Sequence, residues 1–145
     1  MPRNFLDTSA LIKLYRTETN SALVKALLMP SDDLFIAQIT VMEYLSAFYG
    51  LVRQSLLSLS DAQAYIANFQ LDLPQYSLIP MDAHVVIRAQ TLLNIYAVSD
   101  GLRPLDALQL ASALEENART PIDLFVTTDN VLARVAAQCG LLVKP

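Results

Sequence analysis

The sequence predicts an α/β fold in which a parallel sheet is covered by helices on both faces. Short segments of apolar and β-branched residues alternate along the chain with longer segments that carry helix start and stop signals. The length of 145 residues suits one domain, expected to span residues 1–145, and the apolar content of 54% can supply a real core. No internal repeat or linker interrupts the alternation.

These patterns predict the following elements. The expected strands are residues 3–6, 34–37, 77–80, 124–127 and 141–143. The first expected helix is capped by Thr8 or Ser9 and ends at residue 15. Further helices are expected over residues 18–28, 40–54, 60–71, 82–96, 104–117 and 130–138. The helices of residues 40–54 and 60–71 would form a helical hairpin.

Capping and turn residues support these boundaries. Both halves of the hairpin open with the pattern of a capping box, Thr40…Glu43 and Ser60…Gln63. In the second half of the chain, Asp82 is an expected cap, residues 99–101 an expected loop, Pro104 a first helical residue and Gly140 a helix stop. Leu23, Leu27 and Leu28 would share one face of the helix over residues 18–28.

Composition excludes several chemistries. The only histidine is His84 and the only cysteine is Cys139, so a pair of catalytic histidines, a Cys/His zinc site and an intrachain disulfide are excluded. Only three glycines occur, too far apart for a phosphate-binding loop. No apolar run is long enough to span a membrane and no signal peptide is evident, which favours a reducing cytoplasm. Carboxylates are the main reactive groups left.

Four acidic residues stand where sites form in parallel sheets. Asp7 directly follows the strand expected over residues 3–6, and Asp129 follows the strand expected over residues 124–127 after one further residue. Glu43 and Asp106 lie in the first turns of helices. Sites in such sheets form beyond the carboxyl ends of the strands, where the strand order reverses. Each acid except Asp7 also has a local structural interpretation: a capping box for Glu43, the helix dipole for Asp106 and an N-cap for Asp129.

The four segments around these acids resemble a known family. FLDTSALIKLY, TVMEYLSA, LRPLDALQLASAL and FVTTDNVLARVA resemble, in order and spacing, the four acidic motifs of PIN-domain nucleases, especially VapC-like toxins of toxin–antitoxin pairs. One departure is Asn130, where many relatives carry Lys or Arg. Asp123 is not expected at the site, because a strand separates it from Asp129 by about 20 Å.

The resemblance implies a PIN-like three-layer α/β/α fold with a five-stranded parallel sheet of order 3-2-1-4-5. The four acids would lie at its carboxyl edge, with Asp7 and Asp129 facing each other. Two carboxylates ~4 Å apart repel by about 4 kcal/mol at an effective dielectric of 20, so a cation is needed. All-oxygen ligands favour Mg²⁺ or Mn²⁺.

The implied activity is metal-dependent hydrolysis of RNA phosphodiester bonds by an endoribonuclease. Asp7 and Asp106 would hold the better-bound ion, while Glu43 and Asp129 would complete or bridge a second, and one or two ions both remain open. Additional residues are expected to assist: Ser9 and Thr127 would orient waters or carboxylates, and Arg103 would contact a substrate phosphate. His84 is expected to be an ordinary helix residue and Cys139 a core residue.

Expected partners are an RNA substrate such as tRNA, a cognate antitoxin and a second copy of the chain in a homodimer, without a membrane. The mean hydropathy of +0.38 suggests surplus apolar surface. We expect the aromatic rings of the hairpin to supply part of this surface; they are Tyr44, Phe48, Tyr49, Tyr65 and Phe69. Two alternatives stay open: an RNA-processing nuclease without an antitoxin, and an inert PIN-like interaction module. A phosphoaspartyl phosphatase is disfavoured because Ser9 stands where a second Asp is needed.

Overall fold

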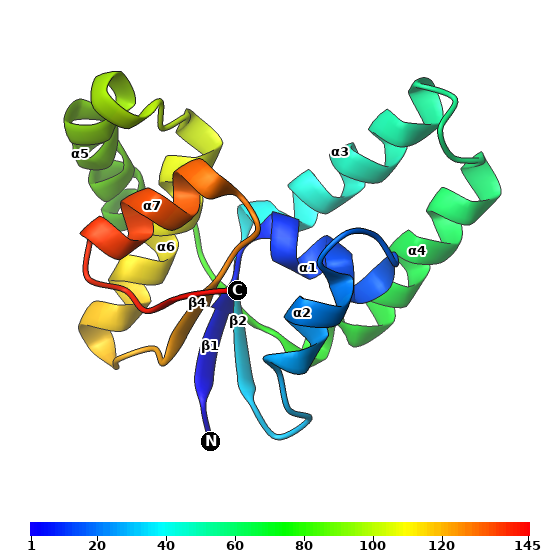
Figure 1. The fold of residues 1–145 in the computed structure, drawn as a ribbon, viewed down its shortest axis with the longest axis horizontal. Coiled ribbons are helices and arrows are strands. Elements are labelled where there is room, and N and C mark those ends of the chain that lie inside the picture. Colours follow the sequence, from blue (N-terminus) through cyan, green and yellow to red (C-terminus); the bar gives the residue numbers. More distant parts are fainter.

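A five-stranded parallel sheet forms the centre of the computed structural model, which describes residues 1–145 (Figure 1). The strands are β1 (Arg3–Leu6), β2 (Asp33–Ala37), β3 (Ser77–Ile79), β4 (Leu124–Val126) and β5 (Val143–Lys144). Their order is β3-β2-β1-β4-β5, and all four pairings are parallel. The predicted α/β class and the strand order 3-2-1-4-5 are confirmed.

Seven α-helices and one short 3₁₀ turn surround the sheet. The helices are α1 (Thr8–Tyr15), α2 (Ser21–Ala26), α3 (Ile39–Arg53), α4 (Leu59–Asp72), α5 (Ala83–Asp100), α6 (Pro104–Arg119) and α7 (Asn130–Gln138), with η1 at Leu73–Gln75. In Figure 1, α5, α6 and α7 lie to one side of the strands and α1 to α4 to the other. None of the helices is both long and apolar enough to cross a membrane.

Alternating residues of the strands feed two separate cores. Phe5 and Phe125 point to the core beneath α5, α6 and α7, whereas Leu6 and Val126 point to the core beneath α1 to α4. This follows from the two-residue period of a strand, and both faces are apolar because both are covered. The rings of Phe5 and Phe125 stack with centroids 5.3 Å apart, which ties β1 to β4. The result is the predicted three-layer arrangement.

The register brings β1 and β4 to an end at the same level. Leu6 is the partner of Val126, and the backbone N–H of Asp7 donates to the Val126 carbonyl over 3.1 Å. The strand order reverses between these two strands, since β2 and β3 lie on one side of β1 and β5 on the other side of β4. The chain therefore leaves the sheet at a switch point, with an acid directly after β1.

Two predicted helix lengths are wrong. Helix α2 begins at Ser21 rather than at residue 18, because Asn20 is left-handed (φ 71°) and breaks the helical path. Leu23 is 55% exposed, whereas Ser21 and Val24 are the buried residues of this helix, so the expected Leu23 face is also wrong. Helix α5 continues through residues 99 and 100, which are expected in a loop, and ends at Asp100, where the left-handed Gly101 (φ 73°) is the C-cap.

Several predicted caps are replaced by others. The side chain of Asp7, rather than Thr8 or Ser9, caps α1 by accepting from the backbone N–H of Ala10. Neither capping box forms: Gln38 precedes α3 without a side-chain cap, and Ser58 caps α4. The predicted start at Pro104, the cap at Asp82 and the left-handed Gly140 (φ 90°) are present.

The helical hairpin buries most of its aromatic rings internally. Tyr44, Phe48 and Phe69 are buried, and Tyr65 stacks on Phe48 with centroids 5.2 Å apart. Only Tyr49 is exposed, at 46%. The expectation that these rings form a partner surface is therefore wrong for the rings other than Tyr49, because α3 and α4 enclose them in one shared ring cluster beside α1.

Candidate functional site

All four acids of the sequence motifs line one pocket at the carboxyl edge of the sheet. The pocket has a volume of about 230 Å³, and its lining consists of Asp7, Thr8, Ser9, Ile12, Glu43, Ala47, Asp106, Gln109 and Asp129. The acids come from four separate segments: the end of β1, helix α3, the first turn of α6 and the start of α7. The topology therefore brings together residues up to 122 positions apart.

Asp7 is the most buried of the four acids, at 3% exposure. Its carboxylate accepts hydrogen bonds from the Ala10 N–H (2.9 Å), the Ser9 hydroxyl (2.7 Å) and the Thr127 hydroxyl (2.6 Å). Burial nevertheless raises the pKa of Asp7 from 3.8 to about 6, and the nearby charge of Asp129 acts in the same direction. The carboxylate is held in one orientation, and its hydrogen bonds offset only part of the cost of burying its negative charge.

Ser9 and Thr127 connect the ends of β1 and β4 around Asp7. The Ser9 hydroxyl accepts from the backbone N–H of Thr128 over 3.0 Å, and the Thr127 hydroxyl accepts from the N–H of Asp129 over 3.1 Å. Both hydroxyls donate to the Asp7 carboxylate. The two residues expected to support the acids therefore contact one of them and also shape the turn that carries another.

Asp106 and Asp129 share a cation, Arg103. The Arg103 guanidinium lies 3.2 Å from the Asp106 carboxylate and 3.8 Å from that of Asp129. The hydrogen bond to Asp106 and the surrounding negative charge, including that of Glu43, raise the pKa of Arg103. Its side chain is 73% exposed, so Arg103 pairs with these two pocket acids from the solvent side.

Asp129 also has the capping role that its position suggested. One carboxylate oxygen accepts from the N–H of Leu132 over 2.8 Å, while the other faces Arg103. A capping carboxylate at a helix N-terminus has a fixed orientation. The structural and site interpretations of Asp129 are therefore compatible.

Glu43 belongs to a hydrogen-bond network that sequence reasoning missed. Its Oε1 atom accepts from Gln109 Nε2 (2.7 Å) and from the Thr8 hydroxyl (3.1 Å), and the Gln109 amide also reaches Thr40 Oγ1 (2.8 Å). Thr40 therefore bonds across to α6 instead of capping its own helix. The available signal was spacing, because Gln109 lies one helical turn after Asp106 and so on the same face of α6.

The donor set suits a hard divalent cation. Every polar atom that the pocket acids present is an oxygen, which favours Mg²⁺ or Mn²⁺ over zinc. The positively charged guanidinium of Arg103 pairs with two of the carboxylates, which shows that a cation is stabilised at this position. No three Asp, Glu, His or Cys side chains are arranged closely enough to coordinate an ion. The oxygen ligands therefore suit such an ion chemically, and the carboxylates would have to lie closer together to coordinate it.

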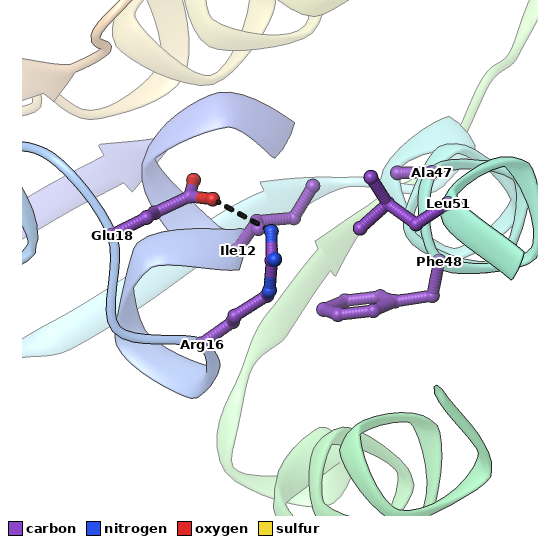
Figure 2. A pocket seen from close by; sticks show the side chains of 6 residues that line it. All are labelled: Ile12, Arg16, Glu18, Ala47, Phe48 and Leu51. Carbon is purple, nitrogen blue, oxygen red and sulfur yellow. Dashed lines mark hydrogen bonds and ion pairs between the residues drawn. The ribbon is translucent and has the colours of Figure 1, made fainter. Parts of the chain in front are cut away.

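A second, largely apolar pocket of about 200 Å³ adjoins the first, since Ile12 and Ala47 line both. Figure 2 shows Ile12 on α1 facing Leu51 on α3, with the Arg16 guanidinium 3.3 Å from Glu18 at the rim. Lys13 also pairs with Glu18, over 2.7 Å. The positive side chains on this flank are therefore partly neutralised.

The remaining reactive residues lie elsewhere. His84 is exposed at the start of α5 and lines a different pocket with Glu115. Cys139 is partly buried and packs against the core, as expected. Asp123 accepts from the backbone N–H of Arg3 over 2.7 Å, at the opposite end of the sheet from Asp7. Its exclusion from the site is confirmed.

The fold and the pocket define a three-layer α/β protein with a carboxylate-lined pocket at its strand switch point. The family model of the PIN domain matches residues 5–138, and the chain belongs to this family. No curated protein sequence matches the chain.

Solved structures with the same fold include a toxin and a toxin–antitoxin complex. VapBC-1 from nontypeable Haemophilus influenzae is 16% identical, with 98% of this chain and 96% of that chain covered and a TM-score of 0.65. A toxin–antitoxin complex from Klebsiella pneumoniae is 18% identical, with 87% and 86% covered and a TM-score of 0.57. VapC20 from Mycobacterium tuberculosis, a sarcin–ricin loop cleaving toxin, is 16% identical, with 98% and 99% covered and a TM-score of 0.65. At these identities the likeness shows a shared fold.

Proposed function

We propose that this PIN-domain protein is a divalent-metal-dependent endoribonuclease and the toxin of a toxin–antitoxin pair. One observation carries the nuclease proposal: four carboxylates from four separate segments line a single pocket. The carboxylates repel one another in such a pocket, and bound cations remove this repulsion. The similarity in fold to toxin chains supports the second half of the proposal.

Asp7 and Asp106 would hold the better-bound Mg²⁺ or Mn²⁺, and Glu43 and Asp129 would complete or bridge a second position. When bound, such ions supply Lewis acidity toward the attacking water and the leaving 3′ oxygen of a phosphodiester. Asp7 suits the role of an ion ligand because its carboxylate is already oriented by three hydrogen-bond donors. Ionised Asp7, disfavoured by burial alone, becomes the favoured form beside a cation.

During substrate binding, Arg103 would release the carboxylates that it contacts and pair with a phosphate of the RNA. In the structure its guanidinium contacts the carboxylates of Asp106 and Asp129, and the side chain is largely exposed. A cation that neutralises those carboxylates frees the guanidinium to pair with a phosphate, a group that arginine binds in the same forked geometry. The same residue would thus couple ion binding to substrate binding.

A structured RNA such as tRNA suits the charge distribution better than extended single strands do. The formal net charge is −4, and it becomes zero only when the four site acids are left out. Without a basic field, general affinity for nucleic acid is weak, so recognition must depend on shape or on a few contacts. VapC20, which has the same fold, is a sarcin–ricin loop cleaving toxin.

A cleavage assay tests the nuclease proposal. Purified protein incubated with total tRNA and ribosomal RNA should cleave in Mg²⁺ or Mn²⁺, stop in EDTA, and leave 5′-phosphate and 3′-hydroxyl ends. Asp106→Asn is the matched control, since it keeps the side-chain shape and removes the charge. Full activity in EDTA, or 2′,3′-cyclic phosphate ends, would refute the metal-dependent mechanism.

The toxin proposal has a separate test. Expression of the chain alone should slow bacterial growth, and co-expression of a short protein encoded immediately upstream should restore growth and copurify with the chain. Asp106→Asn should remove the growth defect while retaining the partner. Unaffected growth and no copurifying partner would favour the RNA-processing alternative and leave the nuclease proposal standing.

A further inference from the structure

We propose that Gln109 is a positioning residue that orients the Glu43 carboxylate for the divalent ion, an assignment that rests on the proposed metal-dependent function. Gln109 lies on α6 and is only 3% exposed. Its side chain lines the acidic pocket beside Glu43. It is a buried, uncharged side chain in direct contact with one of the acids that line the pocket.

The Gln109 amide nitrogen joins three helices at one point. Nε2 lies 2.7 Å from Glu43 Oε1, 2.8 Å from Thr40 Oγ1 and 2.9 Å from Thr8 Oγ1. Thr8 lies on α1, Thr40 and Glu43 on α3, and Gln109 on α6. An amide nitrogen has two hydrogens for these three acceptors, so the carboxylate, the strongest acceptor, takes one and the hydroxyls share the other.

The orientation of this amide follows from its neighbours. An ionised carboxylate only accepts hydrogen bonds, so the opposite orientation would place the amide oxygen against Glu43 Oε1 at 2.7 Å without a hydrogen between them. With Nε2 facing Glu43, the Gln109 Oε1 atom is buried and has no hydrogen-bond partner. An unpartnered buried acceptor is unfavourable for stability. The hydrogen bond from Nε2 to Glu43 therefore accounts for the presence of an amide at this buried position.

The consequence for Glu43 is an asymmetric carboxylate. Both of its hydrogen bonds, from Gln109 and from the Thr8 hydroxyl, end on Oε1. They fix the plane of the carboxylate and leave Oε2 as the oxygen available to a cation. Ligands held in this way bind metals more tightly, because less side-chain freedom is lost when the ion arrives.

Gln109→Met tests this assignment, because methionine has a similar length and no donor. Mn²⁺ binding is measured by electron paramagnetic resonance or calorimetry, together with the melting temperature in EDTA. We expect Mn²⁺ to bind about tenfold more weakly, the lower end of the effect of losing a residue that orients a metal ligand. Ser112→Ala is the matched control: Ser112 is also buried on α6, one turn later, and donates only to the Leu108 carbonyl of its own helix. Its Mn²⁺ affinity should stay within about twofold of wild type.

A double-mutant cycle shows whether Gln109 acts through Glu43. In a Glu43→Gln background, Gln109→Met should weaken Mn²⁺ binding no further, because the carboxylate that it positions is gone. Equal affinity of Gln109→Met and wild type, or an undiminished loss in the Glu43→Gln background, would overturn the assignment. If Gln109→Met does not fold, Gln109→Asn, whose amide is too short to reach Glu43, carries the same expectation.

Failure of this assignment is distinguishable from failure of the proposed function. Wild-type protein that binds Mn²⁺, loses it in Asp106→Asn and keeps it in Gln109→Met would refute the role of Gln109 alone. Wild-type protein that binds no Mn²⁺ would refute the metal site and the assignment together.

Discussion

Replacing Asp7 with asparagine should stabilise the metal-free protein while abolishing its activity. Asp7 is buried among hydroxyl and backbone donors, and its pKa is raised from 3.8 to about 6, mainly by burial. A carboxyl whose pKa is higher in the folded than in the unfolded state destabilises the fold once it ionises. Asparagine has nearly the same shape and carries no charge, so it removes this penalty.

The magnitude follows from the pKa. A rise of about two pH units makes the ionised Asp7 of the folded state unfavourable by roughly 3 kcal/mol. Part of the gain in Asp7→Asn is offset, because the hydroxyls of Ser9 and Thr127 lose a charged acceptor, worth about 1 to 2 kcal/mol together. The net increase in the free energy of unfolding is therefore about 1 to 2 kcal/mol at pH 7.5 in EDTA.

The difference between the two proteins should depend on pH in a specified direction. Well below about pH 4, Asp7 is protonated in both the folded and the unfolded state, so ionisation contributes no penalty and wild type has its full stability. As the pH rises from about 4 to above 6, the unfolded state releases its proton first and wild type loses stability relative to Asp7→Asn. Addition of Mg²⁺ should reverse the order by stabilising only wild type.

Urea denaturation followed by circular dichroism, at pH 4.5 and pH 7.5 in EDTA, measures both quantities. The difference between variant and wild type removes the contribution of every other titrating group. An Asp7→Asn protein that is less stable than wild type at pH 7.5, or a difference independent of pH, would show that the Asp7 carboxylate is a structural cap and would refute the reasoning.

Three further predictions address other parts of the site. Asp106→Asn should lower RNA cleavage at least ~100-fold in Mg²⁺ without changing the melting temperature by more than a few degrees; retained cleavage would remove Asp106 from the proposed ion site. Arg103→Met should weaken RNA binding and lower the salt dependence of binding by about one phosphate contact, with stability changed by less than ~1 kcal/mol because its ion pairs are exposed; an unchanged salt dependence in filter-binding assays would argue against phosphate contact. Tyr44→Phe should cost about 1 kcal/mol in urea denaturation and leave cleavage intact, because the Tyr44 hydroxyl donates only to the Tyr65 carbonyl inside the hairpin; a large loss of cleavage would show that the hairpin core shapes the pocket.

The fold could be predicted from the sequence because its signals are local. Alternation of apolar strands with helices reflects burial on both faces of a sheet, and residues that restrict the backbone, such as Pro104 and Gly140, mark helix ends wherever they occur. The placement of Asp7 after β1 and of Asp129 shortly after β4 followed from the strands themselves. The carboxyl ends of parallel strands suggested one edge for Asp7 and Asp129, and the resemblance of the four ordered motifs to the PIN-domain family added Glu43 and Asp106 to the group.

The sequence by itself thus determined the class of fold and the candidate acids, and its resemblance to the PIN-domain family implied the order of the strands; tertiary structure decided how those acids are held. Thr40 and Glu43 have the spacing of a capping box, yet both bond to Gln109, 69 and 66 residues away, since a buried amide that satisfies two chain segments outweighs a local cap. Likewise, only the packed structure brings Arg103 between Asp106 and Asp129 and encloses the hairpin rings. Such contacts depend on which surfaces meet, and no local pattern of residues records that.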